Sequence, residues 1–95
     1  MEISSSSNVV TITGNIKSIS DFQEIKSTLD MVASSNDTIV INLKDSISIT
    51  SSVIGYFNKL ILKDKISLSL KVGNAQLIDL INDLNLTKIF NATKA

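Results

Sequence analysis

The sequence contains no cysteine and no histidine. Without cysteine the chain can form neither a disulfide framework nor a thiolate metal site, and without histidine it lacks the commonest general base and metal ligand. Nine Lys and Arg residues balance nine Asp and Glu residues, so the chain has no basic excess of the kind that marks a nucleic-acid-binding surface. These absences argue against catalysis, against a bound cofactor or metal, and against DNA or RNA binding.

Long hydrophobic runs are also missing. No apolar stretch approaches the ~20 residues that a membrane-spanning helix needs, and the opening MEISSSSN lacks the basic and then apolar pattern of a secretory signal. We therefore expect a cytoplasmic protein that does not insert into a membrane. With 95 residues and 43% hydrophobic content, residues 1–95 are expected to form a single domain around one core.

The first third of the chain predicts a strand and a helix. Residues 1–7 include a run of serines and fit either a flexible segment or a weak edge strand, whereas Val9–Thr13 is a β-branched run that predicts a strand. Ser20-Asp21-Phe22-Gln23 has the spacing of a capping box, so a helix is expected to begin there. The apolar residues that follow at helical spacing, until residues 34–37 end the pattern, are Phe22, Ile25, Leu29 and Val32.

The middle third predicts a buried strand that leads into a second helix. Thr38–Leu43 is a nearly continuous β-branched run, as expected for the central strand of a parallel sheet that is buried on both faces. Residues 44–49 form the connection, in which Ile47 and Ile49 are expected to be buried. The second helix is expected from about Ser52 to Asp64. Its predicted inward face consists of Val53, Phe57, Leu60 and Ile61.

The last third predicts a half-buried strand over residues 66–72 and a third helix after Gly73-Asn74, with Asn85 as a left-handed stop. Residues 91–95 are expected to be a polar tail. The alternation of strands and helices predicts an α/β fold, a small mostly parallel or mixed sheet covered by about three to four helices. The residues expected to pack the end of the third helix are Leu86, Ile89 and Phe90.

The stretch Asn42–Phe57, NLKDSISITSSVIGYF, carries the candidate site. It places the hydroxyl side chains of Thr50, Ser51 and Ser52 where the second helix begins. The unpaired N–H groups and the dipole of a helix start favour a negatively charged group there. A serine in this position can cap the helix or be phosphorylated, and from the residues alone capping is the more frequent use.

This stretch resembles the signature segment of the STAS family, the sulfate transporter and anti-sigma factor antagonist domains. In that family a strand ending in Asp/Asn-Leu leads to an Asp-Ser-Ser/Thr-Gly-x-Gly run that opens a helix. Thr50 stands where the family usually has Asp, and Val53 where it usually has the first Gly. The positions that fit the pattern are Asn42-Leu43, Ile49, Ser51-Ser52, Ile54 and Gly55.

The resemblance implies a STAS-like sheet with helices mainly on one face and a phosphorylation-controlled interaction switch of the anti-sigma factor antagonist kind. Unmodified Ser51 would bind an anti-sigma factor or serine-kinase-like regulator, phosphorylation would release the domain, and a PP2C-type phosphatase would restore it. Such a protein acts in bacterial signal transduction and transcription regulation, as a monomer or weak dimer. The phosphorylation candidates are Ser51 and Ser52. The implied partner-binding residues are Thr50, Ser51, Ser52, Val53, Ile54, Gly55 and Tyr56.

Val53 and Gly55 each allow two interpretations. Val53 either excludes a partner that needs the family's glycine or belongs to the core face of the helix. Gly55 either permits close packing within the chain or marks a recognition surface. The alternative function is a STAS-like accessory subunit that is not phosphorylated and docks on a larger complex such as a transporter ATPase.

Overall fold

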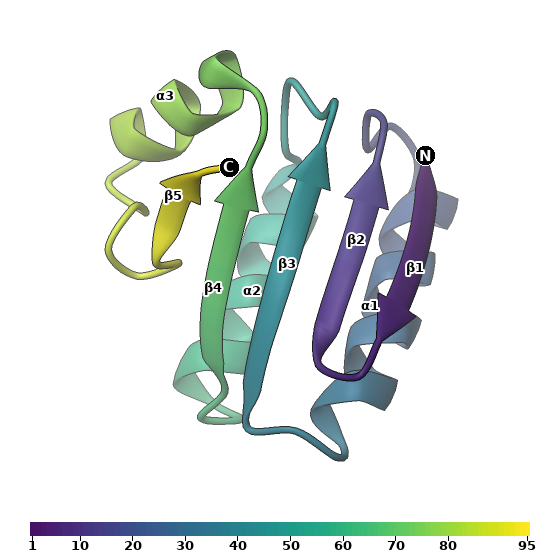
Figure 1. Cartoon of the computed structure of the whole chain (residues 1–95). Coiled ribbons are helices and arrows are strands. Elements are labelled where there is room, and N and C mark those ends of the chain that lie inside the picture. The colour runs from purple at the N-terminus through teal and green to yellow at the C-terminus, as the bar shows by residue number, and fades with distance from the viewer.

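The computed structural model describes all 95 residues and consists of a five-stranded sheet with three helices (Figure 1). The fold is the α/β class that the alternation of strands and helices predicts, and its sheet is mixed and mostly parallel. The elements in chain order are β1 (Glu2–Ser6), β2 (Val9–Thr13), α1 (Ile19–Ala33), β3 (Thr38–Lys44), α2 (Ser51–Leu62), β4 (Ser67–Val72), α3 (Ala75–Asp83) and β5 (Ala92–Lys94).

The order of strands in the sheet follows the order in the chain, and this decides where the helices lie. β1 is antiparallel to β2, whereas all later neighbours pair in parallel. Because each parallel crossover is right-handed and advances across the sheet in the same direction, the connecting helices fall on the same side. Figure 1 shows α1 and α2 behind the sheet and α3 at its upper end beside β5.

The helices therefore cover one face of the sheet. In β3 the side chains of Ile39, Ile41 and Leu43 are buried against the helices, whereas Val40 and Asn42 are half-buried on the open face. The prediction that this strand is buried on both faces is wrong, because an apolar Val40 on the open face makes a one-sided strand look continuous. Its central place in the sheet is as predicted.

The core fills the space between the covered face and the helices. Phe57 of α2 and Phe90, in the turn before β5, meet edge to face with 5.7 Å between ring centroids. A fully buried side chain of this size contributes about 1.5–3 kcal/mol. Phe90 is buried as predicted, but Ile89 beside it is 48% exposed, contrary to prediction. The remaining core is aliphatic apart from Tyr56, and its fully buried members include Val10, Ile12, Ile25, Leu29, Leu60, Leu70, Leu77 and Ile81.

α1 begins before the capping box that the sequence suggested. Its N-cap is Ser18, whose hydroxyl accepts a hydrogen bond from the Asp21 N–H at 3.1 Å. The Asp21 carboxylate in turn accepts from the Lys17 N–H at 2.9 Å. The prediction of Ser20 as the cap is wrong because Ser18 and Asp21 have the same three-residue separation as Ser20 and Gln23, and together they satisfy N–H groups on both sides of the cap.

Both terminal segments pair into the sheet. Residues 1–7 form β1 and the start of a turn, so the edge-strand alternative holds. Residues 91–95 contain β5, which pairs with β4, and the prediction of a polar tail is wrong. Asn85 has a φ of 60°, the left-handed conformation predicted for a helix stop. None of the three helices combines the length and the apolar character needed to cross a membrane.

Candidate functional site

The start of α2 is capped by Thr50 rather than by either serine. The Thr50 backbone is extended, with φ −84° and ψ 158°, and its hydroxyl accepts a hydrogen bond from the Val53 N–H at 3.3 Å. Ser51 and Ser52 follow as the first helical residues, and both are exposed. Neither serine hydroxyl takes part in a hydrogen bond within the chain. The capping function that serine commonly serves is therefore already filled, and the two serine hydroxyls are accessible.

The loop before α2 is held to the loop after β2 by polar contacts. Ser46 is fully buried, and its hydroxyl donates to the Gly14 carbonyl at 2.7 Å. The Ile47 N–H donates to the Asn15 side-chain oxygen at 3.0 Å, and the Ile47 side chain is 48% exposed. The prediction that Ile47 is buried is wrong because Ser46 occupies the inward position. Ile49 is partly buried against the core.

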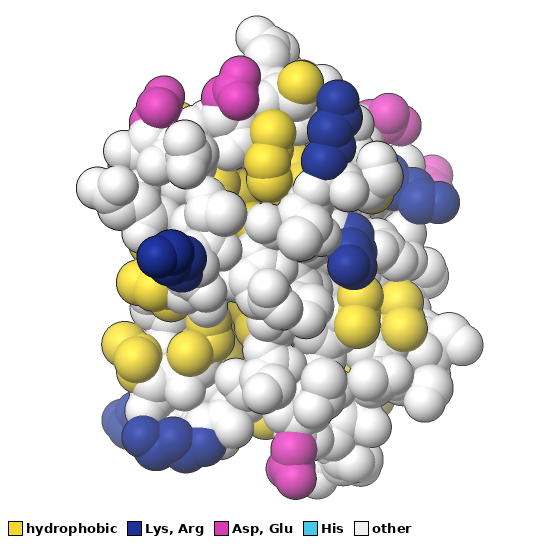
Figure 2. All heavy atoms as spheres, turned by 60° about the vertical axis from the view of Figure 1, so that its left-hand side comes forward, with side chains coloured by type: hydrophobic (Ala, Val, Ile, Leu, Met, Phe, Trp, Pro, Cys, Tyr) yellow, Lys and Arg dark blue, Asp and Glu magenta, His cyan; other side chains and the backbone are white.

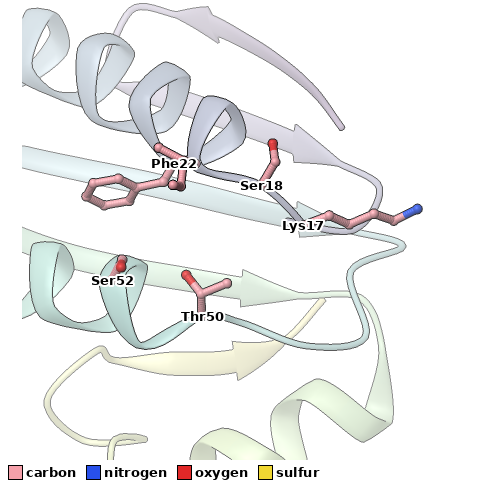
Figure 3. Close-up of a pocket in the computed structure, with 6 residues that line it drawn as sticks. Lys17, Ser18, Phe22, Thr50 and Ser52 are labelled. Atoms are coloured by element: carbon pink, nitrogen blue, oxygen red, sulfur yellow. The ribbon is translucent and has the colours of Figure 1, made fainter.

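These tied loops place the starts of α1 and α2 on either side of a hollow of about 180 Å³ (Figure 3). Ser52 and Thr50 line it from α2, and Phe22 lines it from α1. In Figure 3 the Lys17 ammonium extends away from Ser52 and Thr50. The hollow therefore has an apolar wall, exposed hydroxyls and two nearby helix starts. Its lining residues are Lys17, Ser18, Ile19, Phe22, Thr50 and Ser52.

Ser51 does not line this hollow but lies on the outer face of α2. Helical spacing aligns Ser51 with Gly55, Asn58 and Leu62, and the Leu62 side chain is 67% exposed. Gly55 is exposed, and a Cβ added to it would meet nothing within 4 Å. This stripe, which we call the α2 outer face (Ser51, Gly55, Asn58, Leu62), carries no charged side chain. Packing within the chain does not explain Gly55, although glycine inside a helix costs about 1 kcal/mol relative to alanine.

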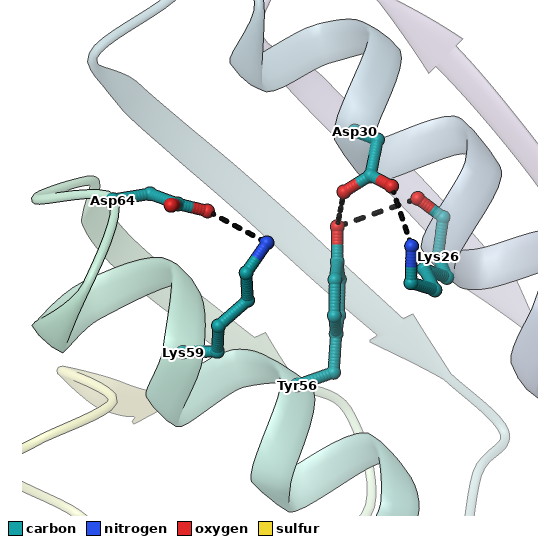
Figure 4. Close-up of polar contacts among 5 residues, drawn as sticks. All are labelled: Lys26, Asp30, Tyr56, Lys59 and Asp64. Atoms are coloured by element: carbon teal, nitrogen blue, oxygen red, sulfur yellow. Dashed lines mark hydrogen bonds and ion pairs between the residues drawn. The ribbon is translucent and has the colours of Figure 1, made fainter.

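The opposite flank of α2 is fixed to α1 by a polar cluster around Tyr56 (Figure 4). The Tyr56 hydroxyl donates to the Asp30 carboxylate and lies 3.3 Å from the Lys26 carbonyl. Lys26 forms an ion pair with Asp30 at 2.9 Å, and Lys59 forms one with Asp64 at 3.1 Å. The ammonium groups of Lys26 and Lys59 each lie 5.8 Å from the centroid of the Tyr56 ring. Both distances are within the range of cation–π attraction.

The cluster shifts the acid–base properties of its members. Burial and then the hydrogen bond to Asp30 raise the pKa of Tyr56 far above its usual value, so the phenol stays protonated. Partial burial opposes ionisation of Asp30, but the hydrogen bonds from Tyr56 and Lys26 outweigh it and lower the pKa of that carboxyl. Tyr56 thus donates to an ionised carboxylate, which is the stronger kind of hydrogen bond.

The structure divides the seven implied partner-binding residues into groups. Val53 and Tyr56 are buried, so neither offers a surface to a partner, and Val53 belongs to the core face of the helix. Thr50 is half-buried, and its hydroxyl is engaged in the capping hydrogen bond with the Val53 N–H. The exposed or partly exposed members are Ser51, Ser52, Ile54 and Gly55.

Sequence reasoning missed the contributions of α1 and of the β2–α1 loop. Phe22, Lys26 and Asp30 recur at helical spacing, which signals one polar and aromatic face, but the periodicity cannot say that this face meets Tyr56. Phe22 packs edge to face on Tyr56 with 6.3 Å between ring centroids. The contacts of Ser46 with Gly14 join residues that lie far apart in the chain, and no local pattern reveals them.

Other parts of the surface do not bring candidate functional side chains together in a comparable way. A second hollow of about 300 Å³ lies at the end of α3, lined by Asn82, Asn85, Thr87 and Lys88. No group of three or more acidic side chains gathers as a metal site would require. On the side of the molecule that carries β5 and α3, positively and negatively charged side chains are spread apart (Figure 2). Hydrophobic side chains lie in separate groups between them.

Comparison with protein-family models and with curated proteins finds no match to this chain.

Proposed function

We propose that this protein is a STAS-like interaction switch, in which phosphorylation of Ser51 releases a protein partner from the α2 outer face. The proposal rests on the different positions of the hydroxyl groups at the start of α2. Thr50 caps the helix, so Ser51 is exposed, makes no hydrogen bond and is available to a kinase.

The position of Ser51 on the helix supports its role as the regulated residue. A phosphate there carries about −1.5 to −2 charges, and the helix start with its unpaired N–H groups tolerates that charge. The modified domain therefore remains folded. On the α2 outer face, however, the same charge lies beside Gly55 on a stripe whose four members are uncharged, and its desolvation opposes binding of a partner that fits the neutral form.

Gly55 supports a close contact with that partner. The absent side chain leaves space that nothing in the chain fills, so a backbone or small side chain of a partner can approach the helix there. Half-buried Ile54, next to the α2 outer face, adds apolar area. The partner we propose is an anti-sigma factor or serine-kinase-like regulator in the cytoplasm, with a PP2C-type phosphatase reversing the modification.

The experiment that tests the switch compares two substitutions at Ser51. Ser51→Ala should bind the partner as tightly as the unmodified protein, whereas Ser51→Asp should bind at least about tenfold more weakly, since one negative charge would stand on the neutral contact surface. Ser48→Asp, which changes an exposed serine in the preceding loop, is the matched control. Equal binding by all three variants would refute regulation at Ser51.

One observation favours the alternative of a permanent accessory subunit. The first turn of α2 carries no acidic residue, so the negative charge that the STAS pattern places beside the serine is missing. A neutral α2 outer face also suits continuous docking on a larger complex such as a transporter ATPase. This alternative predicts stoichiometric copurification with that complex and no phosphate on Ser51 or Ser52.

A further inference from the structure

The two edge strands of the sheet, β1 and β5, differ in whether their outward backbone N–H and C=O groups have hydrogen-bond partners. At the β5 edge, the outward Ala92 N–H already donates to the Thr87 carbonyl at 2.9 Å, and the strand spans only Ala92–Lys94. At the other edge, β1 pairs with β2 over its whole length in regular register. β1 contains no proline, lysine or bulge, the features with which proteins usually protect an edge strand.

The backbone hydrogen bonds of β2 show which groups of β1 point outward. The Asn8 carbonyl accepts from the Val40 N–H at 3.0 Å, and the Gly14 N–H donates to the Lys44 carbonyl at 2.8 Å. The even-numbered residues of β2 therefore direct their backbone groups toward β3. In the hairpin, Ile12 lies opposite Ile3 and Val10 lies opposite Ser5.

Ile3 and Ser5 consequently turn their N–H and C=O groups away from the sheet, because hydrogen-bonded and non-bonded pairs alternate along an antiparallel ladder. No hydrogen bond outside the regular elements occupies these groups. The edge thus presents two complete donor and acceptor pairs, one at Ile3 and one at Ser5.

We propose that β1 pairs with β1 of a second copy of this chain, in antiparallel orientation, about a two-fold axis at Ser4. In this register Ile3 lies opposite Ser5 of the second copy, and each of these residues exchanges an N–H···O=C pair across the junction. The sheet then continues from one copy into the other. This association is separate from the α2 outer face and does not depend on the proposed switch.

A second copy fits this edge better than an unrelated strand because the pairing is self-complementary. Glu2, the only charged residue of β1, lies opposite Ser6 of the second copy, so like charges do not face each other. The partly exposed Ile3 side chains of the two copies become diagonal neighbours on the helix-covered side. A formal net charge of zero also leaves no long-range repulsion between copies.

The register is tested with single cysteines, because the natural chain has none. In the proposed dimer the two Ser4 Cα atoms lie about 4.5 Å apart, close enough for a disulfide. Ser4→Cys should form a covalent dimer under mild oxidation. Ser6→Cys, equally exposed on the same strand, is the control, because its two copies lie about 13 Å apart. Equal crosslinking of both variants, or of neither, would overturn the proposal.

A charge test on the same residues needs no covalent bond. Ser4→Lys places two ammonium groups side by side on the axis and should raise the dissociation constant of the dimer at least about tenfold in sedimentation equilibrium. Ser6→Lys, which would lie opposite Glu2 of the second copy, should leave it unchanged or lower it. Both side chains point to solvent, so thermal unfolding should confirm that both variants fold. A chain that stays monomeric at about 1 mM would contradict the proposal.

Discussion

The Tyr56 hydroxyl of α2 donates its hydrogen bond to the Asp30 carboxylate of α1, and this contact joins the two helices that flank the candidate site. Tyr56 is only 5% exposed, whereas the Asp30 side chain is 42% exposed, so the bond lies where the buried helix interface meets solvent. A family-based reading placed Tyr56 among the partner-binding residues. In the structure its role is to hold α2 in position.

Replacing Tyr56 with phenylalanine removes this hydrogen bond while keeping the ring. We expect Tyr56→Phe to lower the free energy of unfolding by about 0.5–1.5 kcal/mol, because water can solvate the exposed Asp30 carboxylate once the bond is lost. Urea unfolding followed by circular dichroism measures the change. A double-mutant cycle with Asp30→Asn should show a coupling energy of about 0.5–3 kcal/mol, and purely additive effects would contradict the contact.

The lowered pKa of Asp30 predicts how stability depends on acid. Its unfolded-state pKa is near 3.8, and the folded-state pKa is lower, so the ionised carboxylate stabilises the fold above about pH 4. This contribution is lost as the pH falls below that value and Asp30 becomes protonated in the folded state. Urea unfolding at a series of pH values should show a shallower loss of stability for Asp30→Asn, and an identical pH slope would argue against the assignment.

The raised pKa of Tyr56 predicts the opposite behaviour in alkali. The phenol is protonated in the folded state well above pH 10, its ordinary pKa, so its stabilising contribution is complete below pH 10 and declines as the pH rises further. The Tyr56→Phe variant should lose less stability between about pH 10 and pH 11 than the natural protein. Spectroscopic titration should detect tyrosinate only as the chain unfolds, and ordinary titration in the folded protein would contradict this.

Ser46 should matter more for stability than its neighbours in the loop. Ser46→Ala removes the 2.7 Å hydrogen bond that the fully buried Ser46 hydroxyl donates to the half-buried Gly14 carbonyl, so we expect a loss of about 1–3 kcal/mol. Ser48→Ala, an exposed serine in the same loop, should change the free energy of unfolding by less than about 0.5 kcal/mol. Equal effects of the two substitutions would show that the tie between the loops contributes little.

Gly55 should affect stability and binding in opposite directions. Gly55→Ala meets no atom within 4 Å and improves helix propensity, so it should stabilise the fold by about 0.5–1 kcal/mol. The added methyl group occupies the space proposed for a partner and should weaken binding. Ser27→Ala, an exposed substitution on α1, is the control for helix propensity. Unchanged partner binding by Gly55→Ala would remove Gly55 from the proposed interface.

The sequence predicted those features that depend on local patterns. β-branched runs identified β2 and β3, alternating apolar residues identified β4, and the spacing of Ile25, Leu29 and Val32 identified the buried face of α1. The sheet class, the central position of β3 and the left-handed Asn85 also followed from such patterns. The short strand β5 did not, because three residues paired to a neighbouring strand leave too little periodicity to recognise.

Local sequence patterns also predicted only part of the candidate site. Local sequence placed Thr50, Ser51 and Ser52 at a helix start, but three adjacent hydroxyl residues are equally plausible caps. Only the geometry assigns the cap to Thr50 and buries Val53. The hydrogen bond between Tyr56 and Asp30 connects residues that are far apart in the chain, and it depends on how α1 and α2 pack together.

Mass spectrometry of the protein isolated from its own cells tests the central claim most directly. Intact mass and peptide sequencing would locate any phosphate, and a pull-down from the same preparation would show which form carries a partner. The switch predicts phosphate on Ser51 in a fraction of the protein and a partner bound only to the unmodified fraction. Protein that is wholly unmodified and bound in constant ratio to a larger assembly would contradict the switch and support the accessory subunit.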